Sequence, residues 1–395
     1  MTGGAGFIGT NLADRLLREG RKVIIYDNLS RPGVRHNLEW LKQQHGNQFL
    51  FRQGDVRDRE SLQEAVSRAS HVYHFAAQVA VTTSLNDPID DFEINARGTL
   101  NLLEAARAQT EPPSILLTST NKVYGDLRDV ALTISKGRYQ PADRTARAHG
   151  FNENRPLAFH SPYGCSKGAA CQYVLDYSRT FGLRTTVFRM SCIYGLHQFG
   201  NEDQGWVAHF LIQALNHAPI TIYGDGRQVR DILFVEDLVD ALSLARDNIS
   251  SISGQAFNIG GGPRQTISLL ELLDLIEELH GASPHVRFDG WRAADQQYYV
   301  SDIRKFKAAT GWEPKVPVQE GVARLYHWLK DFREHHPEPL LEIHGANGAA
   351  RNGHARPGAL RRQRGNLMPR TPRLNHLPAL RRAAGKGRQG KLAAA

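Results

Sequence analysis

In the first half of the chain, short segments with the apolar pattern of strands alternate with segments that have the pattern of amphipathic helices. The segment 23–27 (VIIYD) is a short apolar run, and 114–120 (SILLTST) has an apolar run at its centre, as in strands that are buried on both faces of a sheet. Before the first of them, Leu12, Leu16 and Leu17 share one face of a predicted helix. Strands that alternate with amphipathic helices predict an α/β fold with a parallel sheet.

Three glycines, Gly3, Gly6 and Gly9, open the first predicted helix. Glycine lets the backbone approach a pyrophosphate, and a helix N-terminus supplies amide donors and positive potential. Asp27 ends the next strand about 20 residues later, where a carboxylate accepts the ribose hydroxyls of a dinucleotide. This arrangement predicts a dinucleotide-binding fold. Asp27 favours NAD because a carboxylate repels a 2′-phosphate, although Arg31 leaves room for NADP.

The next two strand ends extend the predicted cofactor site. Asp55 follows the segment QFLFRQ and can reach the adenine edge. Ala76 and Ala77 are small residues at a place where the backbone must pass close to the cofactor. His71 and His74 precede them and are expected to be hydrogen-bonded strand residues, because their spacing does not suggest a metal site.

The beginning of the chain is short for this motif. Only Met1 and Thr2 precede the glycines, whereas such a motif normally follows a buried strand of roughly five or six residues. We expect the natural start of the protein to lie upstream of Met1.

A tyrosine and a lysine with helical spacing suggest proton chemistry. Tyr163 and Lys167 lie four residues apart on one predicted helix, where an ammonium can lower the pKa of a phenol and make it a general base. A second pair with this spacing, Tyr326 and Lys330, lies on a late amphipathic helix and is assigned to core packing. Thr120 ends a strand at the carboxyl edge of the sheet, where open α/β sheets bind ligands. Its hydroxyl can bond the substrate oxygen that Tyr163 deprotonates.

The segments TGGAGFIG and YGCSK, together with Asp27 and Thr120, resemble the extended short-chain dehydrogenases/reductases of the nucleotide-sugar epimerase and dehydratase group. The resemblance runs from Thr2 to about Lys330. Narrower stretches, among them STNKVYGDL and WRAADQQYYVSD, resemble members that act at carbon 2 of a CDP-linked sugar. The resemblance implies an NAD-dependent enzyme with Thr120, Tyr163 and Lys167 as its catalytic residues.

The resemblance also implies a division of the chain. Residues 1–190, with a contribution from about 230–260, form a Rossmann domain, an α/β doubly wound parallel sheet that binds NAD. Residues 191–335 belong mainly to a smaller C-terminal lobe that binds the nucleotide sugar. The long polar segment 126–160 is expected to be a lid or an insertion near the sugar pocket.

The residues after Thr120 bear on the reaction. Dehydratases of this group carry an Asp-Glu pair there, because elimination of water needs an acid and a base. This chain has Asn121 and Lys122 instead, which favours oxidation and reduction of one carbon, that is, epimerisation. The resemblance implies a CDP-sugar as substrate, epimerised at carbon 2 through a 2-keto intermediate. A carbon-4 epimerase of a UDP-sugar and a nucleotide-sugar dehydrogenase are the alternatives, and a non-catalytic NAD-binding sensor is a remote one.

Further site residues follow from the resemblance. Arg230 and Arg292 are candidates for holding the substrate diphosphate, because a planar guanidinium bonds two oxygens together. Asp295 is expected to accept a ribose hydroxyl, and Thr120 also contacts the substrate. Asn95 resembles an asparagine near the cofactor, with a helix cap as the alternative role. The predicted cofactor contacts are Gly3, Gly6, Phe7, Ile8, Gly9, Asp27, Asn28, Asp55, Val56, Ala76, Ala77, Asn95, Tyr163 and Lys167.

The basic character of the chain belongs to its end. The formal net charge is +9, but residues 337–395 carry 12 Lys and Arg against 2 acidic residues, and residues 1–336 carry a net charge of −1. The end of the chain is rich in Gly, Ala, Pro and Arg without apolar periodicity, which predicts a disordered basic tail. Loose contact of this tail with RNA or an anionic membrane is the alternative to a dispensable extension. The catalytic core is not expected to bind nucleic acid or a membrane.

Location and assembly follow from weaker signals. The three cysteines are too few and too irregular for a disulfide framework or a zinc site, and neither a signal peptide nor an apolar run of about 20 residues is recognised. We therefore expect a cytoplasmic protein without a metal. The helix that begins near Tyr163 has apolar residues on more than one face, among them Tyr173 and Val174, which predicts a homodimer.

Overall fold

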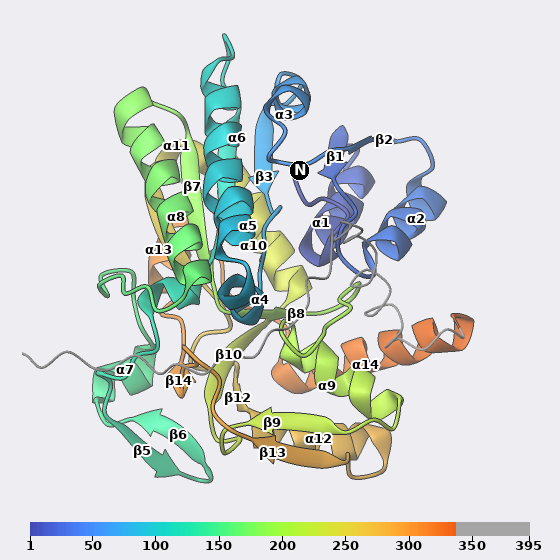
Figure 1. The fold of residues 1–395 in the computed structure, drawn as a ribbon, viewed down its shortest axis with the longest axis vertical. Coiled ribbons are helices and arrows are strands. Elements are labelled where there is room, and N and C mark those ends of the chain that lie inside the picture. Colours follow the sequence, from blue (N-terminus) through green and yellow to red (C-terminus); the bar gives the residue numbers. More distant parts are fainter. Residues whose placement is uncertain (337–395) are drawn as a thin grey trace, which may run out of the picture. The chain divides into compact units, whose positions relative to one another are not determined.

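The computed structural model describes residues 1–336, and the predicted tail at 337–395 lies outside the described residues. Its largest sheet is parallel and is built from strands far apart in the sequence (Figure 1). The order is β2 (Phe49–Gln53), β1 (Val23–Asp27), β3 (His71–His74), β4 (Ser114–Thr120), β7 (Thr185–Met190) and β11 (Gln255–Ile259). Thr2 joins the two parts of this sheet, because it bridges Tyr26 of β1 and His74 of β3.

Helices cover both faces of this sheet, as the doubly wound arrangement requires. One hydrophobic cluster lies under α1 (Phe7–Arg18), α2 (Val34–His45), α10 (Val235–Asp247) and α13 (Arg304–Thr310). A second cluster lies under α3 (Arg59–Val66), α6 (Gly98–Arg107) and α8 (Pro162–Phe181). All seven residues of β4 (SILLTST) are buried between these layers, the three apolar residues and the four with hydroxyl groups alike. Short α4 (Val81–Asn86), α5 (Pro88–Phe92) and a π-helix (Glu93–Arg97) lead into α6, and α11 (Ile249–Ile252) precedes β11.

The sequence explains where the long helix α8 begins and ends. Ser161 is its N-cap, and the Ser161 Oγ accepts a hydrogen bond from Gly164 N at 3.0 Å. Pro162 follows at the first helical position, and Gly182 ends the helix in the left-handed region with a φ of 72°. The backbone amide of Tyr163 also donates to Ser84 Oγ at 3.1 Å. The first turn of α8, which carries Tyr163, is therefore held by contacts from both sides.

The second lobe lies below the Rossmann sheet in the view of Figure 1. Its strands are β8 (Cys192–Tyr194), β9 (Ile220–Tyr223), β10 (Val229–Phe234), β12 (Thr266–Ser268), β13 (Val286–Asp289) and β14 (Tyr298–Tyr299). The strand β10 pairs with β8, β12 and β14, and β9 pairs with β13. The helices α9 (Trp206–Leu215), α12 (Leu269–His280) and α14 (Val318–His335) enclose a third hydrophobic cluster, which contains Tyr326.

The chain passes from one lobe to the other more than once. The strand β11 belongs to the main sheet although β10, just before it, belongs to the second lobe. Residues 1–336 lie within one compact unit, so the residue boundaries predicted between the lobes stay a prediction.

The segment 126–160 forms a hairpin of β5 (Leu132–Ser135) and β6 (Arg138–Pro141), followed by α7 (Arg144–His149). Arg138 pairs with Glu271 of α12 at 3.0 Å, and the Tyr139 hydroxyl donates to Asp225 at 2.8 Å. The segment is therefore an insertion attached to the second lobe. Its role as a lid stays a prediction.

Among residues 1–336, no helix combines the length and the apolar character needed to cross a bilayer. Within the same range, no group of three or more His, Cys, Asp and Glu side chains is arranged to hold a metal ion.

Candidate active site

A cavity of about 350 Å³ lies at the carboxyl ends of β1, β3, β4 and β7, where the two lobes meet. This is the edge at which open α/β sheets bind their ligands. The predicted catalytic and cofactor residues that line it are Gly3, Gly6, Phe7, Ile8, Gly9, Asp27, Asn28, Asp55, Val56, Ala76, Ala77, Thr120, Tyr163 and Lys167.

The glycine segment packs closely against the backbone around it at the start of α1. Gly3 has a φ of 65°, and a Cβ there would lie 2.6 Å from the backbone nitrogen of Ala76. A Cβ on Gly9 would lie 2.6 Å from the carbonyl oxygen of Gly3. Gly6 is the N-cap of α1 and has no side chain that could accept bonds from the first amides of the helix. These residues fit a pyrophosphate, whose oxygens would accept those amide hydrogens.

Asp27 is held in place by the backbone around it. Its Oδ2 accepts a hydrogen bond from Ala5 N at 3.0 Å, and its Oδ1 accepts one from Leu29 N at 2.8 Å. Burial raises the pKa of this carboxyl, although both hydrogen bonds and the charge of Arg31 act in the opposite direction. A carboxylate fixed at the end of β1 suits the ribose hydroxyls of NAD.

Asp55 lies beside this region and is more strongly acidic. Arg57 binds both of its oxygens, and Asn28 donates to its Oδ2 at 2.8 Å. The hydrogen bonds from Arg57 are the main reason that its pKa falls to about 2. Asp55 is therefore an oriented anion on the cavity wall, as a contact to the adenine edge requires.

The three predicted catalytic residues come from β4 and α8. The hydroxyls of Tyr163 and Thr120 are hydrogen-bonded to each other. The Lys167 Nζ donates to the carbonyl oxygen of Thr118 at 2.8 Å, so it lies against the same strand end. The fold thus brings together residues that lie 43 positions apart in the sequence.

The pKa of the tyrosine differs from the prediction. We expected Lys167 to lower it, but burial raises the pKa of Tyr163 to about 12, and the hydrogen bond from Thr120 and the charge of Arg31 offset only part of this. Burial also lowers the pKa of Lys167 to about 8. Both shifts act against the charged forms because the surroundings are poorly solvated, although a pKa of about 8 still leaves Lys167 mostly protonated at neutral pH.

Asn95 lies behind the cavity wall, and its predicted nearness to the cofactor stays a prediction. It is buried inside the π-helix, and its Nδ2 lies 3.0 Å from the Gln78 carbonyl and 3.1 Å from both Asp91 Oδ1 and Ser166 Oγ. Asn95 does not line the cavity that the described residues 1–336 form. Asn95 is therefore neither a helix cap nor a wall residue, and it holds α5 and α8 together behind the wall.

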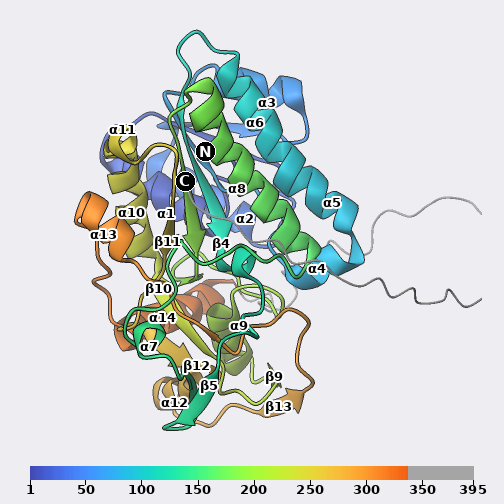
Figure 2. The same cartoon turned by 90° about the vertical axis from the view of Figure 1, so that its left-hand side faces the viewer.

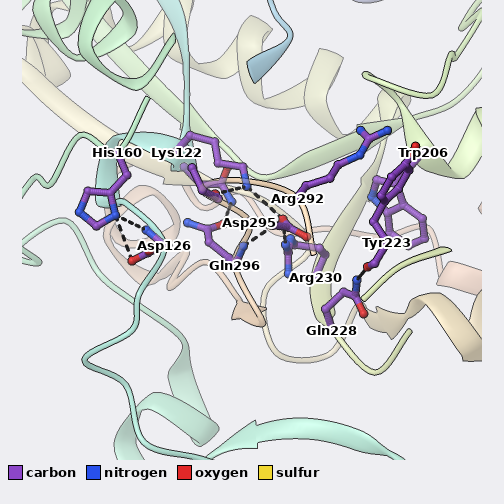
Figure 3. Close-up of polar contacts among 12 residues, drawn as sticks. Lys122, Asp126, His160, Trp206, Tyr223, Gln228, Arg230, Arg292, Asp295 and Gln296 are labelled. Carbon is purple, nitrogen blue, oxygen red and sulfur yellow. Dashed lines mark hydrogen bonds and ion pairs between the residues drawn. The ribbon is translucent and has the colours of Figure 1, made fainter. Parts of the chain in front are cut away.

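The predicted substrate residues fall into two places in the second lobe (Figure 3). Arg230 lies on β10, and its Nη2 binds the Oδ1 of Asp295 at 2.8 Å. Arg292 lies over the ring of Tyr223, 3.9 Å from its centre, and pairs with Glu202 and Asp203. In Figure 3 its guanidinium points away from Asp295. Arg230 and Asp295 are thus in contact, whereas Arg292 is held by the loop that contains Glu202 and Asp203.

Several residues of the site were not predicted. The cavity wall also contains residues 190–193, at the end of β7, and residues 204–207 at the start of α9. Residues 190–193 could have been predicted from the sequence, because ligands bind where parallel strands end. Arg31 also lines the cavity, and its Nη2 donates to Gln204 at 2.7 Å. That contact joins residues 173 positions apart, which local sequence patterns do not reveal.

Comparisons with known proteins agree with this geometry. Residues 1–260 match the model of the NAD dependent epimerase/dehydratase family. The chain belongs to this family. A relative from Salmonella typhi, CDP-paratose 2-epimerase, is 45% identical over 341 residues, which cover 84% of this chain and 99% of the relative.

Solved structures of the family have the same fold. The UDP-glucose 4-epimerase of Thermus thermophilus in complex with NAD matches with a TM-score of 0.68 and 32% identity, over 83% of this chain and 97% of that one. The UDP-glucuronic acid 4-epimerase of Bacillus cereus, solved with UDP-glucuronic acid and NAD, matches with a TM-score of 0.72 and 26% identity, over 84% and 98%. The predicted α/β Rossmann fold, the NAD cofactor and the assignment to the nucleotide-sugar epimerases and dehydratases are confirmed.

Proposed function

We propose that this protein interconverts CDP-paratose and CDP-tyvelose by inverting carbon 2 of the sugar. The likeness to the Salmonella typhi CDP-paratose 2-epimerase supports this substrate, because it extends over nearly the whole relative at 45% identity. The structural relatives that act on UDP-sugars are 26–32% identical.

The observation that carries the proposal is the pair of residues beside the catalytic hydroxyls. The Asn121 Nδ2 donates to Gln296 Oε1 at 3.1 Å, and the Lys122 Nζ lies 3.3 Å from Asp295 Oδ1. Elimination of water needs a proton donor and a proton acceptor at these positions. An amide and an ammonium that are held by other residues do not form such an acid–base pair, because neither accepts a proton, so redox chemistry at one carbon is the reaction that this site favours.

The chain's own residues account for the proton transfers. Tyr163 would take the proton of the 2-hydroxyl as its phenolate while the hydrogen on carbon 2 leaves as a hydride, and the sugar becomes a 2-keto sugar. Burial holds the pKa of Tyr163 at about 12, so the phenolate would form when the positive charge of a bound cofactor lies beside it. The Thr120 hydroxyl bonds the same oxygen and holds it in line. Return of the hydride to the other face of the carbonyl, with the proton given back by Tyr163, completes the inversion. When bound, NAD accepts this hydride and returns it, so it is not consumed.

The same residues explain how the site orients the two ligands. Asp27 and the first turn of α1 would hold the dinucleotide, and Lys167 would bond its nicotinamide ribose. Arg230 and Arg292 would hold the diphosphate of the sugar, and Arg292 would exchange Glu202 and Asp203 for the phosphate.

A turnover experiment tests the function. The purified protein is incubated in deuterated water with CDP-paratose and, separately, with UDP-galactose, and the products are followed by NMR. We expect CDP-tyvelose without deuterium at carbon 2, because the hydride returns from the cofactor and does not exchange with solvent. Deuterium at carbon 2, or conversion of UDP-galactose with CDP-paratose untouched, would refute the proposal.

We also propose that the protein is a homodimer. Ile89 and Phe92 of α5 are 74% and 51% exposed, and Tyr173 of α8 is 43% exposed. The two helices lie beside each other on one side of the Rossmann sheet (Figure 2). A second copy of the same face would remove these apolar side chains from water.

A further inference from the structure

Lys122 is tied to the catalytic threonine by the backbone. It lies in the 3₁₀-helix Asn121–Tyr124, and its amide donates to Thr120 Oγ1 at 3.2 Å. Its side chain is 21% exposed. Burial lowers the pKa of Lys122, and the nearby charge of Arg230 acts in the same direction, while Asp295 opposes both. The charged side chain of Lys122 is thus poorly solvated, two residues from the catalytic Thr120. Such burial costs free energy unless another group compensates the charge.

One carboxylate holds this lysine together with an arginine of the second lobe. Asp295 Oδ1 lies 3.3 Å from Lys122 Nζ and 2.8 Å from Arg230 Nη2, and it also accepts from Gln296 N at 2.9 Å. Figure 3 shows the three charged side chains pointing toward one another. Burial disfavours the charge on Asp295, but the two cations together lower its pKa. The group as a whole carries one excess positive charge.

The position of the reacting carbon decides where the phosphate must lie. In a nucleotide sugar the diphosphate is attached to carbon 1. Carbon 2 is bonded directly to carbon 1, whereas carbon 4 lies on the opposite side of the ring. An enzyme that holds carbon 2 at its catalytic hydroxyls therefore brings the sugar-linked phosphate close to them, and a cation near Thr120 gains a partner that carbon-4 chemistry would keep at a distance.

We propose that Lys122 is a specificity-determining residue that binds the sugar-linked phosphate together with Arg230, while Asp295 orients both cations. This inference rests on the proposed function, because it takes carbon 2 as the reacting carbon. Arg292 would bind the other phosphate of the diphosphate, since its guanidinium points away from Asp295 and lies over Tyr223 (Figure 3). The ammonium thus selects substrates whose phosphate adjoins the reacting carbon.

Binding of CDP and of cytidine, measured by calorimetry on the NAD-loaded protein, separates phosphate recognition from base recognition. Lys122→Met should weaken binding of CDP by about 10- to 100-fold, the loss of one charge-assisted hydrogen bond, and leave cytidine binding unchanged. With CDP-paratose, KM should rise by a similar factor and kcat should change little, because the contact is made in the ground state and the transition state alike. Lys122→Arg should recover part of the affinity.

A control comes from Lys305, an exposed lysine whose Nζ donates to the carbonyl oxygen of Ala256 at 2.8 Å. Lys305→Met should leave CDP affinity unchanged. A general loss of affinity in both methionine variants would show that the effect is not specific to Lys122, and would overturn the proposal.

A double variant excludes a purely structural role. If Lys122 only neutralises Asp295, then adding Lys122→Met to the Asp295→Asn variant should leave CDP binding as it is in Asp295→Asn alone. We expect the double variant to bind CDP at least about tenfold more weakly than Asp295→Asn alone, because the phosphate lacks its lysine. Equal binding by these two variants would overturn the proposal.

The two proposals fail separately. Unchanged CDP affinity in Lys122→Met refutes the role of Lys122 even if the wild-type protein converts CDP-paratose. Conversion of UDP-galactose instead of CDP-paratose by the wild-type protein refutes the carbon-2 function, and with it the reason for a cation at this place.

Discussion

Replacing Tyr163 by phenylalanine removes one hydroxyl and leaves the ring. The side chain is 8% exposed, and its hydroxyl is hydrogen-bonded to Thr120, so the ring keeps its packing in the first turn of α8. Loss of this hydrogen bond should lower the free energy of unfolding by about 1 kcal/mol. Loss of a general base should lower kcat by about 100- to 10,000-fold, which corresponds to about 3–5 kcal/mol of activation free energy.

The assay compares this variant with Tyr326→Phe. Tyr326 begins the second tyrosine-lysine pair of the chain, is 5% exposed, and its hydroxyl lies 3.1 Å from His280 Nδ1. Its variant should lose a similar amount of stability and keep its activity. Conversion of CDP-paratose is measured for both, with NAD binding and thermal unfolding as folding controls. The reasoning is refuted if Tyr163→Phe retains more than about a tenth of the wild-type kcat, or if both variants lose activity equally.

Four further substitutions test other parts of the account. Gly3→Ala puts a Cβ 2.6 Å from the Ala76 nitrogen at a φ of 65°; it should lower the free energy of unfolding by more than about 1 kcal/mol, and a urea midpoint equal to wild type would contradict this. Asp27→Asn should weaken NAD binding about tenfold in a fluorescence titration, and an unchanged titration would exclude the predicted ribose contact. Lys167→Met removes an amine whose pKa burial lowers from 10.5 to about 8, so the unfolded chain binds the proton more strongly between these values. As the pH rises from 8 to 10.5, the free energy of unfolding of the wild-type protein should therefore increase by about 3 kcal/mol relative to that of the variant. A difference in urea unfolding that stays constant with pH would contradict the lowered pKa. Ile89→Arg places a charge on the exposed face of α5 and should give a monomer in light scattering, whereas an intact dimer would locate the interface elsewhere.

Local patterns were sufficient for the cofactor half of the site. Gly3, Gly6 and Gly9 precede a helix, and Asp27 ends the following strand, because this geometry depends on neighbours within about 25 residues. The cavity is lined by these residues as expected. The contacts of Asn95 were not predicted, because its hydrogen bond to Ser166 joins residues 71 positions apart, and only packing of the π-helix on α8 creates that contact.

The substrate half was less predictable. Arg230 and Asp295 were recognised one by one, but their contact spans 65 residues, and Arg292 was expected beside them although it lies on Tyr223. The contact of Lys122 with Asp295 spans 173 residues. Such pairs depend on how the second lobe packs against the Rossmann sheet. The periodicity of a short segment does not predict this packing.

The pKa of Tyr163 shows the same division. The spacing of Tyr163 and Lys167 correctly places both on one helix, and the sequence suggests a lowered phenol pKa. The folded protein has the opposite shift, to about 12, because desolvation depends on every group that surrounds the ring.

By itself the sequence determined the order of strands and helices, the glycine turn, the charge at the end of β1 and the presence of a threonine, a tyrosine and a lysine suited to proton transfer. These follow from backbone conformation and from short-range periodicity, which each segment carries on its own. Only the tertiary structure decided which charged groups meet, how strongly each is desolvated and which residues stand behind the cavity wall. Electrostatic energies vary with distance and with solvent access, and both are set when distant segments pack together.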